Sequence, residues 1–193
     1  MTVSNAILPV SFYERPTLAV TRDLLGCVLH RRFLSGAVKQ AYITEVEAYT
    51  QDDPACHAFR GVTKRSQVLY GEPGIAYVYF IYGMYHCLNV VTEVTGVAGA
   101  VLIRGLSEPG LDGPGKLCRA WQIDRSHNGI NLMDPSSELW IGPRPANFKA
   151  KIGVSKRIGI AQEEAKDYPW RFFIVSEEEQ ANRKRGSKNG RRA

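Results

Sequence analysis

The chain has 193 residues, of which 44% are hydrophobic and 23% charged, with a formal net charge of +6 at pH 7. This composition excludes a disordered or fibrous chain and predicts one globular domain with a single core. No apolar run is long enough to span a bilayer, and the first residues lack the basic start and apolar stretch of a secretory signal, so we expect a cytoplasmic protein.

The first third of the chain predicts one short helix and two strands. Residues 15–26 place apolar side chains at helical spacing and end at Gly26, which is typical of a helix end. Residues 27–34 and 40–49 read as strands joined near Ser35 and Gly36. The polar stretch from 50 to 67 predicts a long loop, and loops of that length are usually functional or disordered.

The rest of the chain predicts mostly strands. Residues 76–83 and 84–93 read as two strands that turn at Gly83, followed by a strand over 99–109 and a helix over 113–124. Two short strands, 138–142 and 169–176, complete the pattern. Because the strands come in neighbouring runs and do not alternate with helices, the fold class is α+β, one domain with a largely antiparallel sheet.

Positive charge is concentrated in two segments. Residues 181–193 contain no acid and six cations, and without those six the basic and acidic residues balance. We expect a domain over residues 1–180 and a disordered basic tail over 181–193, which either tethers the protein to phosphates or only solubilises it. Residues 144–157 carry five more cations and no acid, a pattern that fits either a phosphate-binding patch or a solvated face.

Four cysteines lie far apart in the sequence. No two form a CxxC pair and none has a histidine at zinc-ligand spacing. The spacing predicts reduced thiols without a disulfide framework or a structural zinc site. The cysteines are Cys27, Cys56, Cys87 and Cys118.

Residues 76–90, AYVYFIYGMYHCLNV, place four tyrosines, a histidine and Asn89 in an otherwise apolar run. Buried tyrosines need hydrogen-bond partners for their hydroxyls, so phenylalanine would be the simpler choice for a core. The run fits either a surface that stacks another flat ring or an ordinary half-buried hairpin.

Two carboxylates and an arginine are candidates for chemistry. Glu45 and Glu47 are two apart and share a face if their segment is a strand, so one of them fits a general base and both fit a solvated face. Arg104 stands in an apolar strand, where it either pairs with Glu47 or extends to water. GPGKL, from 113 to 117, fits a single-phosphate contact or a plain helix start and lacks the spacing of a P-loop.

These motifs together resemble one known family. EVEAYTQDDPACHAFRG, YVYFIYGMYHCLNVV, AVLIRGLSEP, GPGKLCRAWQI, RIGI and DYPWRFF occur in the order found in alkyladenine (3-methyladenine) DNA glycosylases. The resemblance extends over residues 8–176. It implies an enzyme that flips an alkylated or deaminated purine out of double-stranded DNA and hydrolyses its N-glycosidic bond, as a monomer without metal or cofactor, associated with the nucleoid. It also implies a curved sheet with flanking helices, similar to a nucleic-acid-binding domain of formyltransferases.

The resemblance assigns roles residue by residue. Glu47 is the catalytic base, Arg104 holds it and its water, and a backbone carbonyl near 158–160 completes the water site. Tyr49, His57 and Tyr79 stack the flipped base, main-chain groups of Ala55 and His57 read its 6-position, and Asn89 rejects the amine of guanine. Tyr82 and Met84 enter the duplex. The backbone contacts are expected from Lys116, Arg119 and Lys156.

One departure concerns the loop before His57. From Glu47 to His57 the chain is one residue shorter than the animal members, with Pro54 in the loop, which affects how the His57 amide is presented. The N-terminal extension of animal members is also absent, which favours a bacterial type. Two other classes remain open: a non-catalytic binding module, which would not need Glu47 and Arg104, and a hydrolase of free nucleosides, which would not need Tyr82.

Overall fold

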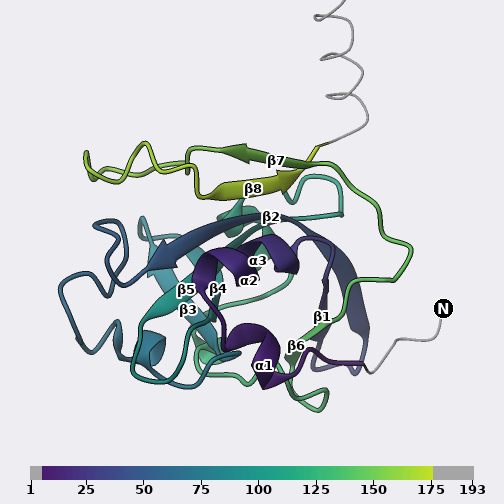
Figure 1. Ribbon diagram of the computed structural model, residues 1–193. Coiled ribbons are helices and arrows are strands. Elements are labelled where there is room, and N and C mark those ends of the chain that lie inside the picture. The colour runs from purple at the N-terminus through teal and green to yellow at the C-terminus, as the bar shows by residue number, and fades with distance from the viewer. Residues whose placement is uncertain (1–5, 176–193) are drawn as a thin grey trace, which may run out of the picture.

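The computed structural model describes residues 6–175, and the tail predicted over 181–193 lies outside these residues. The described chain forms one domain around a strongly curled antiparallel sheet, with helices on either side (Figure 1). The α+β class with an antiparallel sheet is therefore confirmed. The helices are α1 (Val10–Tyr13), α2 (Thr17–Leu24) and α3 (Pro114–Ala120), with 3-10 turns η1 (Gln67–Tyr70) and η2 (Arg125–His127). The strands are β1 (Val28–Arg32), β2 (Val38–Thr50), β3 (Ala76–Ile81), β4 (Tyr85–Val91), β5 (Gly99–Leu106), β6 (Leu139–Gly142), β7 (Ile152–Ser155) and β8 (Arg171–Ile174).

Strand β2 connects the two halves of the sheet. The sheet order is β3-β4-β5-β2-β1-β6. Strand β8 pairs with the last part of β2, on the edge opposite to β5, and also pairs with β7. The first part of β2 pairs with β1, and the last part lies between β5 and β8. The register shifts between Ile43 and Val46, so that both of these side chains enter the core although they are three residues apart. The irregularity leaves Glu45 and Glu47 on the face away from the core side chain Val46.

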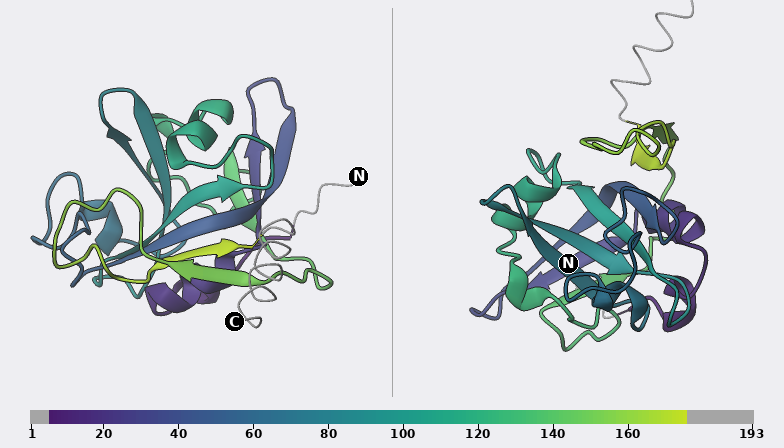
Figure 2. Two further views of the ribbon diagram at one scale, coloured as in Figure 1. Left: turned by 90° about the horizontal axis from the view of Figure 1, so that it is seen from above. Right: turned by 90° about the vertical axis from the view of Figure 1, so that its left-hand side faces the viewer.

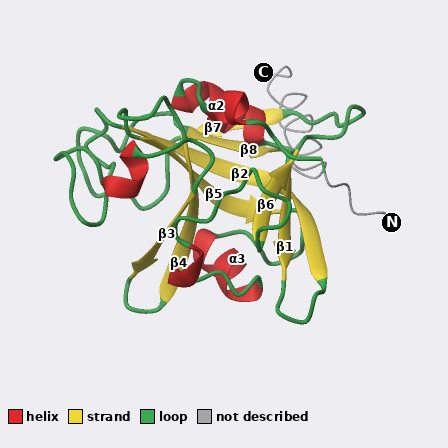
Figure 3. Cartoon of the chain, turned by 90° about the horizontal axis from the view of Figure 1, so that it is seen from below, coloured by secondary structure: helices red, strands yellow, loops and turns green. Residues whose placement is uncertain are grey.

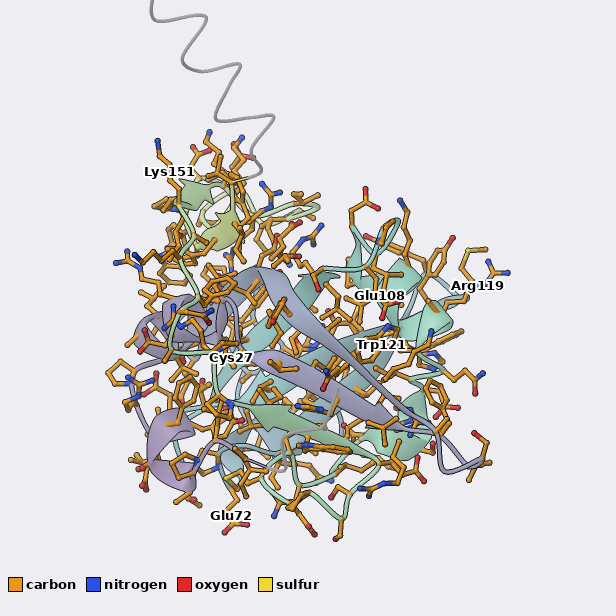
Figure 4. All side chains as sticks on the ribbon, turned by 90° about the vertical axis from the view of Figure 1, so that its right-hand side faces the viewer. Cys27, Glu72, Glu108, Arg119, Trp121 and Lys151 are labelled. Atoms are coloured by element: carbon orange, nitrogen blue, oxygen red, sulfur yellow. The ribbon has the colours of Figure 1, made fainter. Side chains whose placement is uncertain are left out.

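The helices cover different parts of the sheet. Helix α2 packs on β2 and β5, whereas α3 packs on β4 and β5. Figures 2 and 3 show α3 between the β3–β4 and β1–β2 hairpins, with α2 on the opposite side of the sheet. Arg119 of α3 lies at the surface, and Trp121, which follows the helix, is buried in the core (Figure 4).

Most predicted elements are present, and the four that were missed are short: α1, β7 and the 3-10 turns η1 and η2. The predicted helix over 15–26 is α2, the predicted strands correspond to β1–β6 and β8, and no helix or strand interrupts residues 51–66. Helix α1 was missed because it has four residues, too few for a helical pattern. Strand β7 was missed because it lies in the basic segment, and its apolar Ile152 and Val154 are both exposed.

Candidate active site

A cavity of about 550 Å³ opens between the β3–β4 hairpin, the start of α3 and the segment 158–162. Its walls bring together residues that lie far apart in the sequence. They include Tyr49 from β2, His57 from the long loop, Tyr79 from β3 and Arg104 from β5. An aromatic cavity with a few convergent polar groups is the usual form of a binding or active site.

Glu47 lies directly behind the wall of this cavity. Its side chain has no solvent exposure, and it accepts hydrogen bonds from the backbone amide of Ile158 (2.8 Å) and the hydroxyl of Tyr49 (2.8 Å). The Nε atom of Arg104 lies 3.4 Å from its Oε1 atom. Because Tyr49, Arg104 and Ile158 all line the cavity, each group that contacts the carboxylate also faces the space where a ligand would bind.

Arg104 is shared between two carboxylates. Its Nε atom donates to Glu45 at 2.8 Å, a shorter contact than the one with Glu47, and Arg171 of β8 also donates to Glu45 at 2.6 Å. The predicted pairing of Arg104 with Glu47 is present, but its hydrogen bond is with Glu45. Burial opposes ionisation of Glu45, yet the hydrogen bonds from Arg171 and Arg104 lower its pKa, so that it holds Arg104 as a fixed anion.

The pKa of Glu47 is raised above its ordinary value. Burial is the largest cause, because a charge is poorly solvated there, and four neighbours offset part of it. These are the charge of Arg104, the amide of Ile158, the hydroxyl of Tyr49 and the charge of Arg157. A buried carboxylate with a raised pKa is a suitable proton acceptor.

Aromatic side chains form the other walls. The His57 ring meets Tyr79 edge-on, with centroids 4.6 Å apart, and its Nδ1 lies 2.9 Å from the hydroxyl of Tyr77. Burial, with a contribution from Arg65, lowers the pKa of His57 to about 4, so the ring is neutral at pH 7. Sequence analysis counted Tyr77 among the four tyrosines of residues 76–90 but gave it no role of its own, although its spacing of two from Tyr79 in a strand places both on one face.

Asn89 and Ala55 lie at the inner end of the site. Both line a cavity of about 30 Å³ that shares Tyr49, His57 and Tyr79 with the larger one. The Nδ2 group of Asn89 donates to the carbonyls of Tyr77 (3.1 Å) and Cys87 (3.4 Å), which fixes the orientation of its amide. The amide of Ala55 donates to Asp53 at 3.0 Å and is therefore already used within the protein.

The tip of the β3–β4 hairpin exposes apolar side chains. Tyr82 is 78% exposed and Met84 is 65% exposed, and Tyr82 also lines the cavity. Tyr82 has a φ of 52°, and Gly83 has a φ of 67°. A left-handed backbone at a tyrosine costs about 1–2 kcal/mol, and such strain is found most often at functional sites.

The predicted backbone cations are exposed. Lys116 lines the cavity and pairs with Asp112 at 2.9 Å, Lys156 pairs with Asp167 at 2.6 Å, and Arg119 lies on the outer face of α3. The prediction of a basic patch over 144–157 is wrong for Arg157. This side chain has no exposure and forms a buried ion pair with Asp53, so it is unable to contact a phosphate at the surface.

Within residues 6–175, no helix is both long and apolar enough to cross a membrane. No cluster of three or more His, Cys, Asp or Glu side chains in that range is arranged to hold a metal ion. The four cysteines are free and buried.

Comparison with known proteins gives a family for this cavity. The model of the methylpurine-DNA glycosylase family matches residues 11–111 and 109–178. The chain belongs to this family. A provisionally named 3-methyladenine DNA glycosylase of Wolbachia sp. subsp. Brugia malayi is 49% identical over 178 residues, which cover 89% of the chain and 99% of that relative. Relatives with the same provisional name occur in Methanocella arvoryzae, 46% identical (86% of the chain, 92% of the relative), and in Synechococcus sp., 43% identical (83% and 92%).

The resemblance inferred from the motifs is thus confirmed, and the protein is a DNA glycosylase for alkylated bases. Several features that sequence reasoning missed support the predicted residues. Glu45 accepts hydrogen bonds from both Arg104 and Arg171, the hydroxyl of Tyr77 lies at hydrogen-bond distance from His57, and the amide of Ile158 donates to Glu47. Segment 158–160 therefore reaches Glu47 through an amide donor.

Proposed function

We propose that this glycosylase flips an alkylated or deaminated purine nucleotide out of duplex DNA and hydrolyses its N-glycosidic bond with a water activated by Glu47, leaving an abasic site. One observation carries the proposal. Glu47 is fully buried, and the three groups that contact it line an aromatic cavity. A general base beside a slot for a flat ring is what hydrolysis of a flipped nucleotide requires.

Stacking of the purine in the aromatic cavity compensates for the free energy that flipping costs. Unstacking a nucleotide costs a few kcal/mol, whereas each aromatic stacking contact returns about 1–3 kcal/mol. Tyr79, His57 and Tyr49 all line the cavity and offer ring surfaces to an extruded purine. Tyr82 and Met84, exposed at the hairpin tip, fill the gap in the duplex. A free nucleoside would need no such wedge, so the exposed tip favours a duplex substrate.

The chemistry resembles that of an inverting glycosidase. Glu47 accepts a proton from a water whose oxygen bonds to C1′ of the sugar, while the bond from C1′ to N9 of the purine breaks and the base leaves with that electron pair. A purine methylated at N3 or N7 carries a positive charge in the nucleotide and therefore leaves as a neutral base. The negative charge of Glu47 stabilises the oxocarbenium-like transition state. Arg104, fixed by Glu45, holds the water and lowers the pKa of Glu47. Lys116 at the cavity rim is paired with Asp112, and we propose that water is the nucleophile, so the enzyme is monofunctional and does not cut the DNA backbone.

Specificity is assigned to Asn89 and to main-chain groups near Ala55 and His57. Asn89, held by two carbonyls, narrows the inner end of the site, where an amine at C2 of a purine would project. Because the amide of Ala55 is bonded to Asp53, its carbonyl is the group available to a base. We propose that the 6-amino group of an adenine lesion meets this carbonyl, and that the 6-oxygen of hypoxanthine meets the main-chain amide of His57.

The test uses duplexes that each carry one lesion: 3-methyladenine, 7-methylguanine, hypoxanthine or ethenoadenine. After incubation, one half of each sample is treated with alkali, which cuts abasic sites, and the other half is left untreated. We expect strand cleavage in the alkali-treated half only, with at least one lesion. Cleavage in the untreated half would contradict a water nucleophile, and absence of cleavage with every lesion would contradict the activity.

A further inference from the structure

A buried ion pair lies behind the cavity. Asp53 and Arg157 both have side chains with no solvent exposure. The guanidinium binds the carboxylate through its two Nη atoms: Nη1 donates to Oδ2, and Nη2 donates to Oδ1 at 2.9 Å. They are 104 residues apart in the chain. A buried pair of this kind adds little stability compared with well-packed apolar residues, so stability alone is a poor reason for it.

Arg157 touches three parts of the active site at once. Its Nη1 donates to the carbonyl of Ala48 at 2.9 Å, between Glu47 and Tyr49 in β2. Its guanidinium lies 4.6 Å from the centre of the Tyr49 ring, on which it packs as a cation on an aromatic face. Arg157 also immediately precedes Ile158, whose amide donates to Glu47. The position of one guanidinium therefore fixes both Tyr49 and the amide donor to the base.

Asp53 extends this arrangement to the base-reading loop. Its Oδ1 accepts from the amide of Ala55 at 3.0 Å, and its carbonyl accepts from the amide of Cys56 at 2.8 Å. These bonds form the turn that leads to His57. The pair thus joins the loop that presents Ala55 and His57 to the segment that presents Ile158.

We propose that Asp53 and Arg157 act as positioning residues that hold Glu47, Tyr49 and the loop of Ala55 and His57 in one reactive arrangement. This inference rests on the proposed function. Neither residue lines the larger cavity. Their effect passes through the Ile158 amide, the Tyr49 ring and the Ala55 turn. Misplacing a reacting group by about 1 Å can lower a rate on the order of 10²-fold.

Arg31 provides a matched control. It is also an almost fully buried arginine, with a side chain 6% exposed, and it pairs with Glu138 at 2.7 Å and bonds to the carbonyls of Trp121 and Arg32. It belongs to β1 and does not line the cavity. Lysine at either position keeps the charge and loses the planar, bidentate donor set. The two substitutions therefore have similar effects on folding but different effects on the active site.

The experiment compares Arg157→Lys and Arg31→Lys with wild type, by thermal unfolding, lesion-DNA affinity and single-turnover excision per active molecule. Both variants are expected to melt at lower temperature. Only Arg157→Lys is expected to lose about 10²-fold in rate, with lesion-DNA affinity little changed. A second variant, Asp53→Asn with Arg157→Gln, leaves no lone charge in the interior and is expected to fold and to show the same loss.

The pH profile separates positioning from folding. The charged or titratable groups that surround Glu47 are Glu45 and Tyr49 on β2, Cys87 on β4, Arg104 on β5, Arg171 on β8 beyond Glu45, and Arg157 itself. Removal of the Arg157 charge and displacement of the Ile158 amide both disfavour the ionised form of Glu47. In the double variant, the pH below which the excision rate falls (the acid limb of the pH profile) should therefore be higher than in wild type. Arg31→Lys should leave it in place.

The outcomes are distinct. The positioning role is overturned if both Arg157 variants release the base at the wild-type rate and lose activity at the same low pH as wild type. In that case wild type and Arg31→Lys still release the base, and the proposed function stands. If wild type itself releases no base, the proposed function fails.

Discussion

Glu47 is a carboxylate without solvent exposure, and its pKa decides whether it can accept a proton. Burial raises the pKa of Glu47, while Arg104, the Ile158 amide, Tyr49 and Arg157 lower it. The pKa of Glu47 is therefore set by opposing effects, of which burial is the larger. A base of this kind is sensitive to any change in its neighbours.

The first prediction at this scale concerns pH. Excision requires ionised Glu47, so the rate should fall as pH drops through its raised pKa. Arg104→Gln removes the charge that most lowers the pKa of Glu47. The acid limb should therefore move to higher pH, with partial recovery of the rate under more alkaline conditions. Single-turnover excision measured over a range of pH checks this, with Lys39→Gln, an exposed cation of β2, as the control. An unmoved limb in Arg104→Gln would contradict the role of Arg104.

A second prediction concerns base selection. Asn89→Ser removes the amide that we place against the C2 position, so discrimination against guanine should relax. The change removes a steric and polar penalty and adds no attraction, so guanine excision should rise while hypoxanthine excision stays level or falls slightly. Excision rate constants for hypoxanthine and for guanine opposite thymine are the measurement. A constant ratio of the two would show that Asn89 does not face the base.

At the scale of elements, the β3–β4 hairpin contributes both a wall and an exposed tip. Tyr79 lines the cavity from the strand, and Tyr82 is exposed at the turn with a left-handed backbone. Gly115 allows α3 to pack closely on this hairpin, since a Cβ atom there would lie 2.8 Å from the ring of Tyr85. The hairpin is thus supported by α3 next to its turn, at Tyr85, while Tyr82 and Met84 of the turn stay exposed.

The prediction for this element is that Tyr82→Asn lowers excision from duplex DNA and leaves excision from a single-stranded lesion unchanged, because a single strand has no stack to fill. Asparagine tolerates a positive φ, so the melting temperature should stay the same or rise slightly. The control is Leu34→Asn at the tip of the β1–β2 hairpin, where Leu34 is 99% exposed. Equal losses on both substrates would contradict a wedge.

Some of the residues and strands around the site could be predicted from the sequence, and others could not. Glu47, Tyr79 and Asn89 lie in strand segments whose short motifs match those of the family, so their roles were predicted from that resemblance. The pair of Asp53 and Arg157 was not, because its members are 104 residues apart and Arg157 stands among surface lysines. Strand β7 was missed because its pairing with β8, and not its own pattern, makes it a strand.

At the scale of the molecule, β2 joins the two halves of the curled sheet and carries Glu45, Glu47 and Tyr49 where three strands meet. Glu47, which we propose as the catalytic base, thus lies on a strand that pairs with three others, β1, β5 and β8. The loops and the hairpin around it supply the surfaces that contact a ligand. A residue positioned by a strand beneath loops that line a cavity is a common arrangement in enzymes.

The prediction for the whole molecule concerns charge. Deletion of 181–193 removes six cations and should weaken binding to all duplexes by a similar factor, because binding to phosphates does not read sequence. For every phosphate that the shortened protein no longer neutralises, the slope of log affinity against log salt should decrease by about 0.9. Titrations at several salt concentrations measure the slope. An unchanged slope would assign phosphate binding to the body of the protein.

The central claim is that Glu47 is the base that activates water, and Glu47→Gln tests it most directly. Because burial raises the pKa of Glu47, its ionisation costs the folded state stability as pH rises through that pKa. Glutamine avoids this cost, so at pH 7 the variant should melt at no lower temperature than wild type and should bind lesion DNA nearly as well. Single-turnover excision should fall by about 10²–10⁴-fold. A folded variant that still releases the base within a few fold of the wild-type rate would contradict the claim.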